Sequence, residues 1–229
     1  MSEATNAAAI QKIHSDLVDR LISEARDKVK GFVKPADEYG NPRLIISRYV
    51  ATVGINFTDW IGKTYPWTRH ELAQYALKDN LRCEQSEDHI GMLIKFAEHA
   101  MYFPEWNQFA HSKEVRVIRQ LLSNIEDAGL TGLIILAILE NTSEVFIPVL
   151  EKLIQKFHLL HRKTYGSADL TYTQAHGKAD AKHSDAFTAA LKAEWTMGYR
   201  NHEGIVFNAS NAAVNFLRRI FEETPIADK

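Results

Sequence analysis

Two histidines and an aspartate, His176, Asp180 and His183, recur at helical spacing in the C-terminal part of the 229-residue chain. Because an α-helix advances about 100° per residue, the three side chains fall within roughly 60° on one helix face. Imidazole and carboxylate donors on one stripe suit iron, manganese or zinc. A solvated polar face is the alternative, because Lys178 and Lys182 flank the triplet. The triplet indicates a metal site, and a dinuclear site would need further ligands from facing helices.

A carboxylate at the end of an apolar run is the first candidate for such a ligand. Glu140 follows ten uncharged residues, 130–139, and burying an unpaired carboxylate there would be costly. Metal ligation would offset that cost, whereas exposure at the helix end would remove it. Glu144 lies one turn later and could take the same role. We therefore expect Glu140 or Glu144 to supply a ligand.

A second cluster of donors lies between residues 84 and 89, where six positions hold three carboxylates and a histidine. Glu84 and His89 are five residues apart, about 140° around an ideal helix. A bulge or a helix break would bring both to one metal. Otherwise Glu87 or Asp88 would have to replace one of them.

Two further residues near these donors could do chemistry. Tyr172 precedes His176 by one turn and could donate a hydrogen bond or take part in redox chemistry, although a packing role is the alternative. Cys83 is the only cysteine and could act as a nucleophile beside Glu84. Neither a helix N-terminus nor a histidine partner is apparent for it, which favours a small buried residue.

Composition excludes several classes of partner. The formal net charge is −2 and basic residues do not cluster, which argues against nucleic acid and anionic membranes as partners. A single cysteine permits no internal disulfide, the N-terminus lacks a signal-peptide pattern, and the apolar run 130–139 is too short to span a bilayer. We therefore expect a cytoplasmic protein without a membrane segment.

Helical periodicity dominates the chain, and strand signals are few. Helices are expected over residues 7–32, 44–60, 70–82, 89–102, 112–128, 130–140, 147–162, 172–198 and 208–223. Gly129 is expected to close the helix before it, and Pro148 to lie in a first turn. Without a repeat or a linker, the pattern predicts one all-α domain over residues 1–229, a class that often forms homodimers.

The order of these motifs resembles that of the haem-oxygenase-like diiron oxidases and oxygenases, such as the CADD-like and UndA-like proteins. The matching pieces are Asn80-Leu81-Arg82-Cys83-Glu84, His89 with the apolar helix after it, Glu140, Tyr165-Gly166, and Tyr172-x3-His176-x3-Asp180-x2-His183. The resemblance covers residues 44–200. It implies a haem-oxygenase-like (TenA/CADD-like) helical bundle in which two irons are bound by Glu84, His89, Glu140, His176, Asp180 and His183.

The activity that this resemblance implies is the oxidation of a small organic metabolite by dioxygen, with two iron ions as the cofactor. One ion rather than two stays open, as does manganese, because the same oxygen and nitrogen donors suit both metals. Two other functions are compatible with the same scaffold. One is a metal-free TenA-like hydrolase that uses Cys83, and the other is a non-catalytic CADD-like interaction protein.

Overall fold

The computed structural model describes residues 3–101 and 106–223, without the side chains of residues 3–8, 10, 55, 106–107 and 177–181. Over this part of the chain the protein is helical and has no strand, which confirms the all-α class. The helices are α1 (Glu3–Phe32), η1 (Ala36–Glu38), α2 (Pro42–Tyr49), η2 (Val50–Gly54), α3 (Ile55–Thr64), η3 (Tyr65–Trp67), α4 (Glu71–Ser86), α5 (His89–Ala97), α6 (Trp106–Ala110), α7 (Lys113–Leu122), α8 (Ala128–Leu160), α9 (Arg162–Tyr165), α10 (Thr171–Trp195) and α11 (His202–Phe221).

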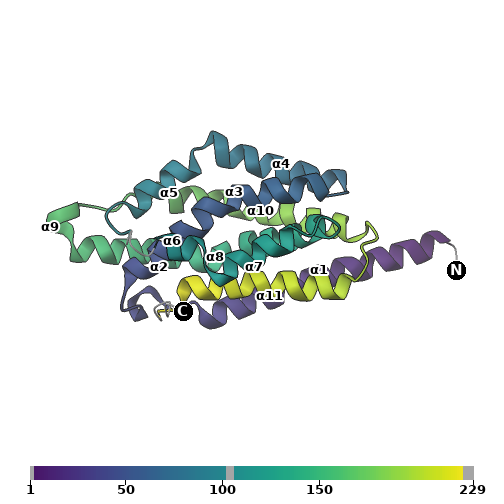
Figure 1. The fold of residues 1–229 in the computed structure, drawn as a ribbon, viewed down its shortest axis with the longest axis horizontal. Coiled ribbons are helices and arrows are strands. Elements are labelled where there is room, and N and C mark those ends of the chain that lie inside the picture. The colour runs from purple at the N-terminus through teal and green to yellow at the C-terminus, as the bar shows by residue number, and fades with distance from the viewer. Residues whose placement is uncertain (1–2, 102–105, 224–229) are drawn as a thin grey trace.

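Helix α8 is the centre of an elongated bundle (Figure 1). It contacts α1, α2, α3, α7, α10 and α11, and all of its residues from 128 to 143 are buried. With 33 residues it is long and apolar enough to cross a membrane, so the expectation that the apolar run is too short was wrong. However, 78% of its most apolar window is buried inside the protein, as is typical of a core helix.

Two expected interruptions of α8 are absent. Gly129 was expected to end the preceding helix, but that helix ends at Leu122 and Gly129 lies in the first turn of α8. A Cβ at this glycine would collide with the backbone carbonyl of Trp67, so the glycine serves close packing and not helix termination. Pro148 lies inside α8 and does not begin a new helix. Buried residues on both sides of the proline, such as Phe146 and Leu150, hold the two halves to the same core.

The helix expected over 44–60 is divided into three parts. Between α2 and α3 the chain forms a π-helical turn, η2, over Val50–Gly54. Such a turn inserts a residue into the helical pattern and changes which side chains face inward, and it is frequent at functional sites. Val53 and Gly54 of this turn line the cavity described below.

Candidate metal centre

A helix break separates the first two donors, as one of the sequence-based interpretations required. Helix α4 ends at Ser86, and α5 begins at His89. Between them Asp88 adopts a left-handed conformation with φ of 50°, which aspartate tolerates better than most residues. Its carboxylate also accepts the N–H of Gly91 at 3.2 Å and so caps α5. The turn directs His89 back towards Glu84.

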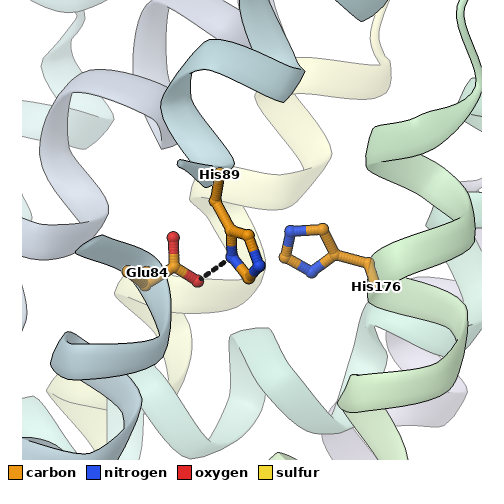
Figure 2. A group of neighbouring side chains, drawn as sticks. All are labelled: Glu84, His89 and His176. Atoms are coloured by element: carbon orange, nitrogen blue, oxygen red, sulfur yellow. Dashed lines mark hydrogen bonds and ion pairs between the residues drawn. The ribbon is translucent and has the colours of Figure 1, made fainter. Parts of the chain in front are cut away.

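Three side chains from three helices converge at this break (Figure 2). Glu84, His89 and His176 each offer one donor atom, and these atoms lie within 4.8 Å of one another. Oε1 of Glu84 lies 2.9 Å from Nδ1 of His89, and the rings of His89 and His176 are 4.9 Å apart at their centroids. Glu84 and His89 are buried, with 8% and 2% of their surface exposed.

The donor set fits a divalent metal ion. Two imidazoles and a carboxylate are ligands for iron, manganese and zinc, and donors bound to one ion lie about 3 to 4 Å apart. Because the three donor atoms lie within 4.8 Å of one another, the most distant pair needs to approach by about 1 to 2 Å to hold an ion. The hydrogen bond to Glu84 raises the pKa of His89 although burial lowers it, so a metal ion bound by this imidazole would compete with a proton.

A second pair of donors lies beside this group. Nδ2 of Asn80 is 3.2 Å from Oε1 of Glu140 and 3.2 Å from Nδ1 of His183. All three residues are buried. Asn80 precedes Glu84 by one turn of α4, so one face of this helix carries both groups. The amide thus holds a carboxylate from α8 and an imidazole from α10 at a short distance from each other.

One cavity connects most of the expected ligands. Glu84, His89, Glu140 and His176 all line it, and its empty space is about 600 Å³ with the open solvent at its mouth included. His183 is linked to this set through Asn80. Asp180 belongs to α10, but its side chain lies outside the described residues.

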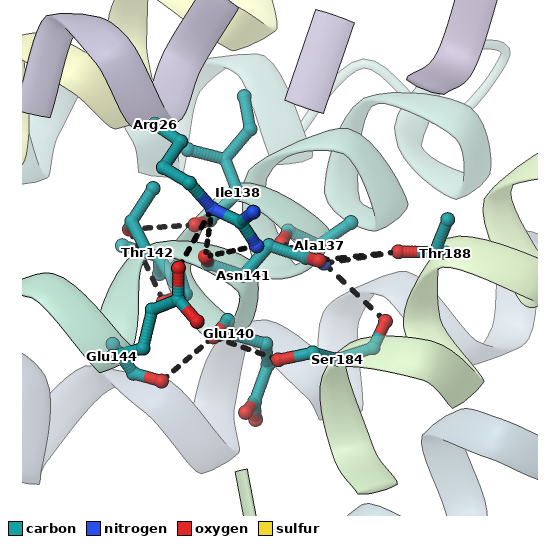
Figure 3. A network of polar contacts seen from close by, with 11 residues as sticks. Arg26, Ala137, Ile138, Glu140, Asn141, Thr142, Glu144, Ser184 and Thr188 are labelled. Carbon is teal, nitrogen blue, oxygen red and sulfur yellow. Dashed lines mark hydrogen bonds and ion pairs between the residues drawn. The ribbon is translucent and has the colours of Figure 1, made fainter. Parts of the chain in front are cut away.

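Glu144, the alternative to Glu140, does not line this cavity. Its exposed carboxylate lies 3.0 Å from Nε of Arg26 on α1, whereas Glu140 is 7% exposed (Figure 3). Glu144 lies one turn after Glu140 on α8, where its side chain faces α1 and forms an ion pair with Arg26. The interpretation of Glu144 as a ligand is therefore not supported.

Hydrogen bonds fix the backbone of α8 at Glu140 (Figure 3). Its carbonyl oxygen accepts the hydroxyls of Ser143 at 2.7 Å and Ser184 at 3.0 Å. The amide of Asn141 donates to the carbonyl of Ser184 and to the hydroxyl of Thr188, which joins α8 to α10. The position of the Glu140 carboxylate is thereby set by contacts between two helices.

Tyr172 lines the cavity together with a tyrosine that the sequence did not single out. Its hydroxyl is 2.7 Å from that of Tyr49, and its ring is 4.4 Å from the ring of His176. Both tyrosines are 3% exposed. Asn80 was also missed as a positioning residue, although its place one turn before Glu84 was a usable signal.

Cys83 is half-buried beside Glu84. Burial raises the pKa of its thiol, and the carboxylates of Asp79 and Glu87 raise it further. Because the thiolate is the reactive form, this environment weakens Cys83 as a nucleophile.

Compared with known proteins, the sequence matches no protein-family model and no curated protein.

Proposed function

We propose that this protein is a non-haem metal-dependent oxidase or oxygenase that uses dioxygen to oxidise a small organic molecule. The observation that carries the proposal is the convergence of Glu84, His89 and His176 from three helices, with donor atoms within 4.8 Å of one another beside a cavity. We further propose that the fold is haem-oxygenase-like and that the bound metal is iron. The raised pKa of Cys83 argues against the hydrolase alternative.

In this proposal the two groups of donors hold two ions. Glu84, His89 and His176 would hold one, and Glu140 and His183 a second, with Asp180 assigned by the motif alone. When bound, ferrous ions supply the electrons that reduce dioxygen.

The remaining residues position these ligands and shape the site. Asn80 orients Glu140 and His183 through its amide, and outer partners of this kind typically tune ligand orientation. Tyr49 holds the hydroxyl of Tyr172 within the cavity, where that phenol can give or take a proton. The apolar part of the cavity wall excludes water from the reacting groups.

The decisive experiment measures metal content after expression with iron and manganese supplied together. We expect iron bound to the wild-type protein and largely lost from His176→Ala, while His111→Ala, which changes an exposed histidine outside the cavity, retains it. Anaerobic ferrous protein should change its absorption when dioxygen is admitted. A wild-type protein without metal, or an unchanged metal content in His176→Ala, would contradict the proposal.

A further inference from the structure

The cavity beside the donors is lined mainly by apolar side chains. Val53, Phe57, Leu93 and Phe146 belong to its wall, and none of its described lining residues is a lysine or arginine. A carboxylate or phosphate that entered it would meet the carboxylates of Glu84 and Glu140, and no lysine or arginine among these residues would pair with it. Burying a charge without a partner is strongly unfavourable. The wall is therefore suited to an uncharged group.

One part of this wall is formed by the π-helical turn η2 and helix α5. Gly54 ends the turn, and a Cβ added to it would lie 2.7 Å from Cδ2 of Leu93. Such a separation is too short, so the end of the Leu93 side chain would have to move. Both residues line the cavity, and Leu93 lies one turn after His89 on α5. The contact between Gly54 and Leu93 thus sets the space available next to His89, a candidate metal ligand.

Building on the proposed function, we propose that this cavity binds the uncharged hydrocarbon part of the substrate, an aromatic ring or an alkyl chain. The contact between Leu93 and Gly54 limits the size of that part. The donors at the same cavity then face an apolar group held in a largely dry environment, as in many small-molecule sites.

The test uses the full-length protein freed of metal with a chelator, and toluene as a neutral probe whose binding is followed by saturation-transfer NMR. Benzoate has the same ring with a carboxylate and serves as the charged counterpart. We expect toluene to bind and benzoate to bind about tenfold more weakly or not at all, since its charge would be buried beside the carboxylates of Glu84 and Glu140 with no lysine or arginine of the lining to pair with it.

Matched variants test whether toluene binds in this cavity. Leu93→Phe should weaken toluene binding about tenfold by filling the cavity. Ile94→Phe changes the next residue of α5, which is 51% exposed and does not line the cavity, and should leave binding unchanged. Gly54→Ala should weaken binding, and Leu93→Ala in the same chain should restore it, because the two residues are in contact. Circular dichroism checks that each variant folds.

The outcomes separate this inference from the proposed function. Equal binding of benzoate and toluene, or undiminished toluene binding by folded Leu93→Phe, would overturn the inference. A wild-type protein that takes up metal but does not bind toluene would also overturn it and leave the metal site standing. Toluene binding by a protein that takes up no metal would support the cavity assignment and remove the proposed oxidase function.

Discussion

Oε1 of Glu84 lies 2.9 Å from Nδ1 of His89, although the two residues belong to different helices. On one continuous helix their five-residue separation would point them about 140° apart. The left-handed Asp88 lies in the turn between the two helices and caps the second, and so brings the two donors together. The candidate metal centre therefore depends on a single turn.

Asp88 offers a direct test of this dependence. Asp88→Ala removes the cap and places a residue with no polar side chain in a left-handed conformation, so we expect a loss of about 1 to 2 kcal/mol in the free energy of unfolding. Metal affinity should fall as well, because His89 is displaced. Asp88→Asn retains the cap and tolerates the conformation, and should resemble the wild type. Urea unfolding and metal competition measure the two effects, and identical results for the two variants would disprove the role of the turn.

Glu140 and Glu144, one turn apart on α8, form a natural matched pair. Glu140→Gln should lower the amount of bound metal, since it changes a buried carboxylate that lines the cavity. Glu144→Gln removes only the exposed ion pair with Arg26, so we expect full metal content and a stability loss below about 1 kcal/mol. Metal analysis of both purified proteins checks this. The reverse result would show that Glu144 is the ligand.

A buried carboxylate anchors the start of α4 and predicts a response to alkaline pH. Glu194 is fully buried and accepts the backbone N–H groups of Arg69 and His70, each at 2.8 Å, as well as the hydroxyl of Tyr199. Burial, and then the hydrogen bond to Glu194, raise the pKa of Tyr199 well above the ordinary value of a tyrosine. The folded protein therefore binds this proton more tightly than the unfolded chain.

The stabilisation linked to this proton is complete below about pH 10 and is lost as the pH rises towards the folded-state pKa. We expect Tyr199→Phe to lower the free energy of unfolding by about 1 kcal/mol at neutral pH, because a buried acceptor loses its donor. The difference from the wild type should shrink above about pH 10. Urea unfolding across this range measures it, with Tyr75→Phe, 67% exposed, as the control. A difference that does not change with pH would contradict the assignment.

Cys83 distinguishes the oxidase from the hydrolase alternative. Because burial raises the pKa of its thiol, we expect iodoacetamide to modify it no faster than free cysteine at neutral pH. Cys83→Ser should keep its metal and any dioxygen-dependent activity. A fast-reacting thiol, together with a hydrolytic activity that Cys83→Ser abolishes, would favour the hydrolase.

Several features of this protein follow from local sequence. Helical periodicity determined the all-α class, and the spacing of His176 from Tyr172 placed both on the face of α10 that lines the cavity. The uncharged run before Glu140 singled this carboxylate out but left open whether it is buried or exposed at a helix end, and the structure places it at 7% exposure. These inferences succeeded because helix geometry relates residues three or four positions apart without reference to the rest of the chain.

Other features were decided by tertiary contacts. The choice between Glu140 and Glu144 depends on Arg26, more than a hundred residues away along the chain, and the close approach of the Trp67 carbonyl explains why residue 129 is a glycine. The pairing of Tyr49 with Tyr172 likewise joins distant segments. Helical periodicity predicts which side chains share a helix face, but only the packing of the helices decides which residues that face contacts.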